Sequence, residues 1–266
     1  MDPEARFGVL LTVAYDGARF SGFARQPEAR TVAGELDFAV RAVDPTASLV
    51  RGASRTDAGV HALSQRVAFD TRLDVPPRAW ALALARHLDD EIAIVQAARV
   101  APDYDPRSHS VKKLYRYLVL RSPVRDPFLR RRAWRLDDRL NHALMQDELA
   151  ALVGTNDFRA FRTSTDRRTE TVRTVFRADA FDASDPRILC IEIEGDNFLH
   201  RMVRIIVGTV VDVGRERLEP GAVARGLSTG DRRVLGITAP PDGLYLANHV
   251  LDDDGQDKWP DHLSVR

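Results

Sequence analysis

The spacing of apolar residues changes several times over the first hundred positions. Dense or extended apolar runs predict strands, and stretches with apolar residues three and four positions apart predict amphipathic helices. Thr31 can cap the first helix, and the pair Pro76 and Pro77 suits the first turn of the second. The predicted order is strand, helix, strand, strand, helix and strand, at residues 7–14, 31–43, 47–51, 65–70, 76–88 and 92–100. This order is typical of the ferredoxin-like arrangement, in which helices cover one face of an antiparallel sheet.

A polar, proline-containing stretch at residues 104–110 indicates a linker, and a second module follows it. Residues 111–120 alternate in the manner of a strand, with Tyr115 and Tyr117 on the same face. The further elements expected are a helix, two strands, a long apolar helix, a short helix and a last strand, at residues 138–152, 171–181, 188–194, 197–214, 221–227 and 244–250. The sequence therefore predicts an α+β fold with two subdomains and an acidic, solvated tail, at residues 1–107, 108–250 and 251–266.

The composition is that of an ordinary globular protein, with 266 residues of which 44% are hydrophobic and 29% are charged. The single cysteine, Cys190, excludes a disulfide framework within the chain and a cysteine-based zinc cluster, and its apolar neighbours predict a buried position. No apolar run approaches the roughly 18 residues that span a bilayer, and the start of the chain does not resemble a signal peptide. We therefore expect a soluble, cytoplasmic protein with no membrane partner.

Charge is balanced, with 39 basic and 39 acidic residues, which by itself argues mildly against a nucleic-acid partner. Phosphate attraction acts locally, however, so the distribution of charge matters more than the total. All but three of the basic residues are arginines, whose planar guanidinium suits phosphates and stacks on bases. One basic run, residues 125–135, carries Phe128 and Trp134 between its arginines. It is either an RNA-binding segment or a solvated surface.

The apolar helix expected at 197–214 leaves a narrow polar strip that includes Arg204 and Gly208. Arg204 lies between Val203 and Ile205, so its guanidinium either reaches past the helix to solvent or pairs with a buried anion. Pairing is the favoured interpretation. Gly208 follows one turn later and leaves room for another backbone or a ligand to approach.

Residues 52–62 lie between two predicted strands and form a loop that contains Gly52 and Gly59. Arg55 and Asp57 are two positions apart, which in an extended backbone directs both side chains to the same side. A carboxylate needs such a cationic partner if it is to stay ionised in a partly dry cleft. The alternative is that Asp57, which Ala and Gly follow, is an ordinary turn residue.

The octapeptide Arg-Thr-Asp-Ala-Gly-Val-His-Ala, residues 55–62, resembles the active-site loop of the TruA-type tRNA pseudouridine synthases. Five further segments resemble other blocks of that family, at residues 17–26, 113–117, 154–158, 198–208 and 243–246. The resemblance implies the pseudouridine synthase fold, in which two ferredoxin-like subdomains share a continuous, mainly antiparallel sheet with a central cleft. One departure is visible, because the family usually has glycine before Arg-Thr-Asp and this chain has Ser54.

The resemblance also implies roles for individual residues. Asp57 is the aspartate that starts the isomerisation of uridine, and Arg204 is the arginine that pairs with it. Tyr115 packs on the target uracil, and Arg55 enters the RNA when the base turns out of the stem. Further contacts to RNA phosphates are expected from Arg130, Arg131, Arg132, Arg167 and Arg168.

The implied substrate is a uridine at positions 38 to 40 in the anticodon stem-loop of tRNA, and the implied assembly is a homodimer whose subunits jointly hold the tRNA. The chemistry requires no metal and no cofactor, and it stays open whether Asp57 attacks C1′ or removes a proton from C2′. His61 and His200 lack a second ligand at metal-binding spacing, so structural roles are expected. Two alternatives are a non-catalytic RNA-binding module on the same fold and an aspartate-dependent nucleotide hydrolase.

Overall fold

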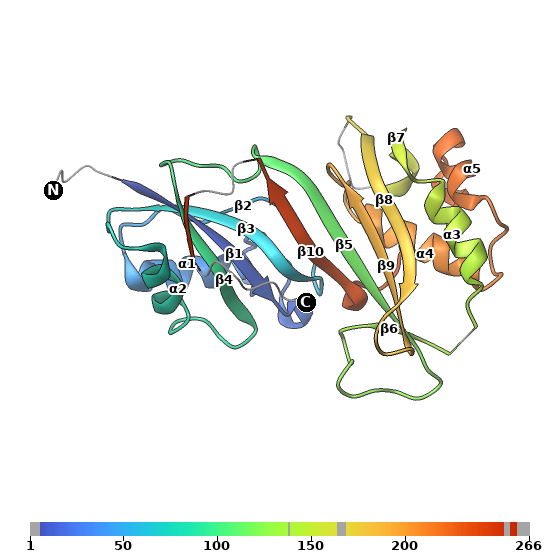
Figure 1. Ribbon diagram of the computed structural model, residues 1–266, viewed down its shortest axis with the longest axis horizontal. Coiled ribbons are helices and arrows are strands. Elements are labelled where there is room, and N and C mark those ends of the chain that lie inside the picture. The colour runs from blue at the N-terminus through green and yellow to red at the C-terminus, as the bar shows by residue number, and fades with distance from the viewer. Residues whose placement is uncertain (1–5, 138, 164–168, 253–255, 260–266) are drawn as a thin grey trace. The chain divides into compact units, whose positions relative to one another are not determined.

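Strands and helices are mixed along the chain in the part that the computed structural model describes, which comprises residues 6–137, 139–163, 169–252 and 256–259 (Figure 1). The fold is α+β with a mainly antiparallel sheet, as predicted. Within these residues, no helix has both the length and the apolar character needed to cross a membrane. Single turns of 3-10 helix lie at Gly17–Arg19, Arg159–Phe161, Arg232–Val234 and Pro241–Gly243.

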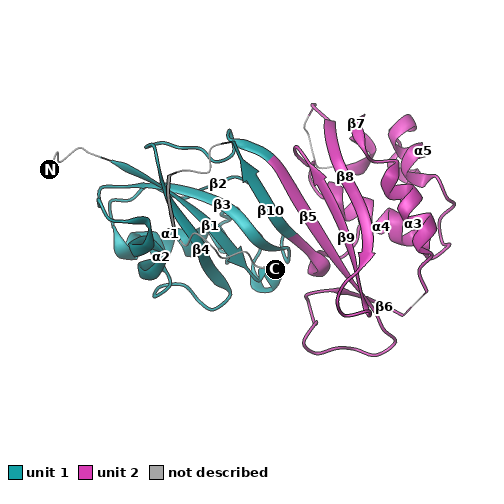
Figure 2. Ribbon diagram, viewed as in Figure 1, with its two compact units in different colours: residues 1–111, 246–266 teal, residues 112–245 magenta. Residues whose placement is uncertain are grey.

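The chain divides into two compact units, one of residues 1–111 with 246–266 and the other of residues 112–245 (Figure 2). Both boundaries fall inside strands, since β5 (Ser110–Arg121) carries the chain into the second unit and β10 (Leu244–Leu251) carries it back. This division differs from the predicted one at the C-terminal end. β10 lies beside β3 (His61–Thr71), and β11 (Gln256–Trp259) pairs with β4 (Ile92–Val100). Residues 246–250, predicted to end the second subdomain, and residues 256–259, predicted to lie in a solvated tail, therefore extend the sheet of the first unit.

The first unit contains a ferredoxin-like sheet. β1 (Phe7–Tyr15) pairs antiparallel with both β3 and β4, and the short β2 (Arg51–Gly52) pairs antiparallel with β3. The resulting order, β4-β1-β3-β2, confirms the architecture predicted for the first hundred residues. The strand predicted at 47–51 is wrong for most of its length, because the Val50 amide donates to the Asp37 carboxylate (2.8 Å) instead of to a neighbouring strand.

Helix α1 (Val32–Val43) begins where the sequence predicts. The Thr31 hydroxyl oxygen accepts a hydrogen bond from the Gly34 amide (3.3 Å), which satisfies one of the amides that have no partner inside the first turn. Leu36 and Val40, one turn apart, are both buried. The helix is therefore held by its cap and by an apolar face that packs into the first unit.

Helix α2 (Pro77–Leu84) is anchored by Trp80, whose ring lies edge-on to Phe69 with 4.9 Å between the ring centroids. The prediction that Leu88 belongs to this helix is wrong. The residues directly after the helix are exposed and form a turn that leads to β4, so no apolar face remains to stabilise a further turn of helix.

The second unit repeats part of the strand order of the first. β5 pairs antiparallel with β9 (Ile188–Gly195), which pairs antiparallel with β8 (Val172–Asp182), so that β5-β9-β8 corresponds to β1-β3-β2. Two short strands extend this sheet, β7 (Gly154–Asp157) beside β8 and β6 (Trp134–Leu136) parallel to β5. Cys190 on β9 is buried, as predicted.

The described part of the second unit contains three α-helices: α3 (His142–Ala150), α4 (Met202–Gly214) and α5 (Ala222–Thr229). The prediction that Asn197 caps α4 is wrong. Arg201 has a left-handed backbone (φ 60°) and is the N-cap: its carbonyl oxygen accepts the Ile205 amide (3.0 Å), but the chain before it cannot continue the right-handed helix. The first five residues of the predicted helix lie outside it.

The start of α5 is capped by a carboxylate from α3. Glu148 is buried, and its side chain accepts hydrogen bonds from the amide of Gly221 and from the amide of Val223 (2.7 Å). Gly221 precedes the helix and has no side chain with which to cap it. The negative charge also lies at the positive end of the helix dipole, where it is stabilising.

We expect Glu148→Leu to lower the free energy of unfolding by about 2 to 3 kcal/mol, because two buried amides lose a charged acceptor. The measurement is urea denaturation followed by circular dichroism. Glu219→Leu removes an exposed glutamate from the same region and is the control, expected to lie within about 0.5 kcal/mol of the wild type. Equal stability of the two variants would contradict the capping role.

Candidate active site

The loop that contains Asp57 joins β2 to β3 in the first unit. Asp57 is half-buried, whereas Arg55 is exposed. The Val60 amide donates to the Asp57 carbonyl oxygen (3.2 Å), so the backbone closes a turn directly after the aspartate. The alternative that Asp57 lies in a turn is therefore correct for its backbone. The turn does not explain the side chain, so the Asp57 carboxylate is the group considered for chemistry.

The side chain of Gln65 holds the loop on one side of Asp57. It accepts a hydrogen bond from the Ser54 amide (3.2 Å) and donates one to the Ser54 carbonyl oxygen (2.7 Å). Gln65 lies on β3 and is fully buried. These two hydrogen bonds fix the backbone at Ser54, the position at which the sequence departs from the glycine that usually precedes Arg-Thr-Asp.

The hydroxyl of Thr56, next to Asp57, lies 2.7 Å from the hydroxyl of Tyr15 on β1. Burial raises the pKa of Tyr15 by more than its hydrogen bonds to Thr56 and Gln65 lower it, so the phenol stays neutral at physiological pH. A neutral hydroxyl can donate and accept, which is what a paired threonine requires. Two buried side chains, Tyr15 and Gln65, therefore flank the loop.

The segment at residues 17–26 forms the backing of the same loop. The Phe23 amide donates to the Thr56 carbonyl oxygen (3.1 Å), and the Gly59 amide donates to the Phe20 carbonyl oxygen (3.3 Å). Gly22 has a positive φ of 101°, and a Cβ atom there would lie 2.9 Å from the Thr56 carbonyl oxygen. Glycine is needed at that position for two independent reasons.

His61 and His200, for which the sequence predicts structural roles, both contact neighbouring groups of the protein. His61 is buried, with its Nδ1 atom 3.1 Å from both the Gly17 amide and the Asp16 carboxylate. His200 places its Nδ1 atom 3.0 Å from the Thr163 hydroxyl. Among the residues that the structure describes, no group of three or more His, Cys, Asp or Glu side chains is arranged to hold a metal ion.

The structure separates the roles of the two tyrosines on β5. Tyr117 is fully buried; its hydroxyl donates to the Pro240 carbonyl oxygen (2.8 Å), and its ring lies edge-on to Trp134. Tyr115 is half-buried, and its ring lies edge-on to Phe198 at a centroid distance of 5.1 Å. Tyr117 is thus part of the core, and Tyr115 is the tyrosine whose ring remains partly accessible.

Arg204 lies on α4 and is half-buried. Its Nε atom donates to the Ala239 carbonyl oxygen (2.8 Å), and the Ala239 amide donates to the Arg204 carbonyl oxygen (3.0 Å). The segment at 236–240 therefore fixes the direction of the guanidinium. The positive charge of Arg204 also acts on Tyr117: it lowers the pKa of that phenol, which burial raises by a larger amount.

Gly208 allows that segment to approach, because a Cβ atom there would lie 1.9 Å from the Ile237 carbonyl oxygen. The prediction that Gly208 leaves room for another backbone is confirmed. Asp212, one turn further along α4, accepts a hydrogen bond from the Ile237 amide (3.1 Å). Three positions of the predicted polar strip, Arg204, Gly208 and Asp212, are thus used to hold the 236–240 segment.

Of the arginines expected to contact RNA phosphates, Arg130, Arg131 and Arg132 are exposed on the loop between β5 and β6. Arg131 Nε lies 3.7 Å from the Asp242 carboxylate. Arg167 and Arg168 lie outside the described residues.

The structure places Arg55 and Asp57 on one loop of the first unit, and Tyr115 and Arg204 in the second unit. The pairing of Asp57 with Arg204 stays a prediction. Gln65 and Tyr15 were not predicted to support this loop. Gln65 begins the strand predicted at 65–70, Tyr15 directly follows the one predicted at 7–14, and neither carries a motif of its own. A buried amide on a strand that flanks a glycine-bounded loop is the signal that could have indicated Gln65.

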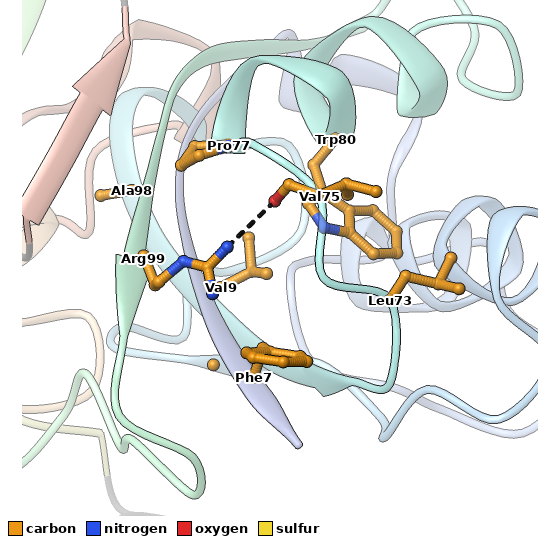
Figure 3. A pocket seen from close by; sticks show the side chains of 9 residues that line it. Phe7, Val9, Leu73, Val75, Pro77, Trp80, Ala98 and Arg99 are labelled. Atoms are coloured by element: carbon orange, nitrogen blue, oxygen red, sulfur yellow. Dashed lines mark hydrogen bonds between the residues drawn. The ribbon is translucent and has the colours of Figure 1, made fainter. Parts of the chain in front are cut away.

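A small pocket elsewhere in the first unit has a different character (Figure 3). Apolar side chains dominate its lining, with Trp80 and Leu73 among them. Arg99 is the charged residue in this lining, and it donates to the Asp74 carboxylate (2.7 Å) and to the Val75 carbonyl oxygen (3.4 Å). No carboxylate lines the pocket, so it offers no acid–base chemistry.

Comparison with known proteins gives a consistent result. The family model described as tRNA pseudouridine synthase matches residues 11–107 and 149–250. The chain is 37% identical over 238 residues to a protein named tRNA pseudouridine synthase A from Geotalea daltonii, covering 90% of this chain and 97% of that one. Proteins with the same name from a Thermoanaerobacter species and from Bacillus subtilis are 39% and 38% identical, over 90% and 91% of this chain and 97% and 98% of theirs.

We expect Gly208→Ala to lower the free energy of unfolding by about 1 to 3 kcal/mol, because the added methyl group displaces the Ile237 carbonyl from α4. Thermal or urea unfolding measures the effect. Gly34→Ala is the matched control in a helix, since its added Cβ would meet only the Thr31 hydroxyl, at 3.1 Å. Alanine has the higher helix propensity, which offsets the small shift required of the Thr31 hydroxyl, so this control should change the free energy of unfolding by less than about 1 kcal/mol. An unchanged stability of Gly208→Ala would contradict the close approach.

Proposed function

The chain belongs to the tRNA pseudouridine synthase family, and on that basis we propose that it isomerises uridine to pseudouridine in the anticodon stem-loop of tRNA, at positions 38 to 40. The observation that carries the proposal is the carboxylate of Asp57, half-buried on a loop whose backbone is held before it at Ser54 and after it at Gly59. A group that must react at one atom of a bound nucleotide benefits from such fixed placement.

The reaction rearranges bonds without adding or removing atoms. The bond between ribose C1′ and uracil N1 breaks, the base rotates, and a bond between C1′ and C5 forms. The proton on C5 is lost, and N1 ends with a proton. An ionised Asp57 can begin this sequence either as a nucleophile at C1′ or as a base at C2′. Neither route needs an oxidant or a reductant.

We propose that Arg204 pairs with Asp57 and keeps its carboxylate ionised in a site from which the bound RNA excludes water. The fixed direction of the guanidinium, set by the Ala239 carbonyl oxygen, supports this role. The detached uracil would pack on the ring of Tyr115, whose orientation the edge-on contact with Phe198 restricts. Stacking of this kind retains the base without preventing its rotation.

A uridine inside a stem is not accessible to a carboxylate, so the base must turn out of the helix at a cost of a few kcal/mol. Arg55 is exposed beside Asp57 and is suited to occupy the space that the base leaves. Phosphate contacts through Arg130, Arg131, Arg132, Arg167 and Arg168 would hold the RNA in register. We also propose that the enzyme works in the cytoplasm as a homodimer whose subunits jointly hold one tRNA.

We expect Asp57→Asn to reduce pseudouridine formation by about 1000-fold or more, because the amide is neither a nucleophile nor a base. Affinity for tRNA should change little, since no phosphate contact is lost. The assay incubates the protein with an unmodified tRNA transcript and maps pseudouridine by specific chemical labelling. Asp90→Asn, which changes an exposed aspartate of the same unit, is the control and should retain full activity. Turnover by Asp57→Asn would refute the assignment, and binding without product by the wild type would favour the non-catalytic RNA-binding module.

We expect light scattering to give twice the mass of the chain at concentrations where the enzyme is active. A tRNA-binding surface divided between two subunits can be locally basic although the chain carries 39 residues of each sign. A stable monomer with full activity would contradict the dimer and would leave the catalytic assignment unaffected.

A further inference from the structure

The loop between β5 and β6, residues 122–133, combines strong positive charge with an exposed aromatic ring. It contains Arg125, Arg130, Arg131 and Arg132, all of which are exposed. Its single acidic residue is Asp126. The negative charge of this carboxylate is neutralised by the Arg187 guanidinium, which lies 3.1 Å away. In a chain with no net charge, this loop is a local concentration of cations.

Several contacts hold the 122–133 loop in one conformation. Leu129 packs against a buried cluster that includes Leu120 and Cys190 on the sheet of the second unit. The Asp126 carboxylate accepts the Phe128 amide (3.0 Å), and the Arg132 carbonyl oxygen accepts the Tyr245 hydroxyl (2.8 Å). These contacts fix both arms of the loop, so the direction of the side chains at its tip is determined.

Phe128 has 83% of its surface exposed, the largest fraction among the large hydrophobic side chains that the structure describes. Its neighbour Leu129 shows that the loop can bury an apolar side chain against the sheet. The backbone at Arg131 has a positive φ of 59°, a conformation that costs about 1 kcal/mol or more for a residue with a side chain. A held loop that keeps an aromatic ring in water between arginines has the composition of a nucleic-acid contact.

We propose that Phe128 is a stacking surface for an unpaired nucleobase of the tRNA, while Arg130 and the other arginines of the 122–133 loop bind the adjoining phosphates. This inference rests on the proposed function, since it names a further contact of the same enzyme with its substrate. An aromatic ring stacks on any base, and the guanidinium groups beside it neutralise the backbone that carries that base.

Charge favours RNA over a second copy of the chain as the occupant of this loop. A two-fold contact centred on Phe128 would bring the four arginines of one subunit against the same four of the other. Like charges in such an interface are repulsive, whereas RNA supplies a phosphate for each guanidinium. The exposed ring and the surrounding charge thus fit the same ligand.

The test compares four proteins for binding to an unmodified tRNA transcript by filter binding: the wild type, Phe128→Ala, Phe128→Leu and Phe128→Trp. Loss of one base stack should weaken binding about tenfold in Phe128→Ala and in Phe128→Leu, and Phe128→Trp should bind at least as tightly as the wild type. Leucine keeps the apolar bulk and lacks the flat π face, which separates stacking from hydrophobic burial. The slope of log Kd against log salt should stay unchanged in these variants, and should fall by about one in Arg130→Ala.

Phe38→Ala is the matched control, because Phe38 is 66% exposed on α1 and follows Glu35 and Asp37 instead of a run of arginines. It should bind tRNA like the wild type. If Phe128→Leu binds like the wild type while Phe128→Ala does not, the ring is buried against apolar surface and the inference is wrong. The inference is also wrong if Phe128→Ala lowers the mass measured by sedimentation, since the loop is then a subunit contact.

Filter binding and the mapping of pseudouridine, carried out on the same proteins, separate failure of this inference from failure of the proposed function. If the wild type forms pseudouridine and all Phe128 variants bind and react equally, the stacking role alone is overturned. If the wild type binds tRNA and forms no pseudouridine, the proposed function is overturned, whatever the variants show.

Discussion

Each chemical role considered for Asp57 requires its carboxylate to keep one position while a large RNA arrives, distorts and leaves. Loop residues ordinarily move more than the strands beside them. Here the amide and the carbonyl oxygen of Ser54 are both bonded to the buried Gln65, and the hydroxyl of Thr56 contacts that of Tyr15. The loop is therefore tied to the sheet that supports it, and the cost of ordering its backbone around Asp57 is met during folding and not during reaction.

In the second unit, hydrogen bonds from neighbouring groups likewise fix the position of a charged side chain, Arg204. The 236–240 segment has no helix or strand of its own over most of its length, yet it contacts α4 through Arg204, Gly208 and Asp212. The hydroxyl of Tyr117 holds it at Pro240. The polar groups in this region hydrogen-bond to one another, which offsets the free-energy cost of burying them. The network gives the Arg204 guanidinium a defined direction.

Elements with strong periodicity were predictable from the sequence, and elements defined by side-chain contacts were not. β4 has the predicted bounds because apolar residues predominate along it, and the start of α1 was predictable because its cap, Thr31, leaves a sequence signature. The start of α4 was misplaced because Arg201 has a left-handed backbone that no apolar pattern reveals. The prediction of a strand at 47–51 failed because Asp37, 13 residues before Val50, takes the Val50 amide that a strand would use.

The same distinction holds for the candidate site. The octapeptide at 55–62 located the carboxylate, and the spacing around Gly208 indicated the approach of another backbone. Alternation along β5 could not distinguish Tyr115 from Tyr117, since both lie on one face. Only the environment of each ring, with Tyr117 fully buried and Tyr115 half-buried, separates them.

The position of β10 has a consequence for biosynthesis. During translation, residues 7–100 can form β1, β3 and β4 long before residues 244–251 leave the ribosome. Until then, the eleven-residue β3 has an open edge beyond its short pairing with β2 and can associate with strands of other nascent chains. A chain that terminates prematurely before residue 244 keeps that edge permanently, so it should depend on chaperones and become a target for proteolysis.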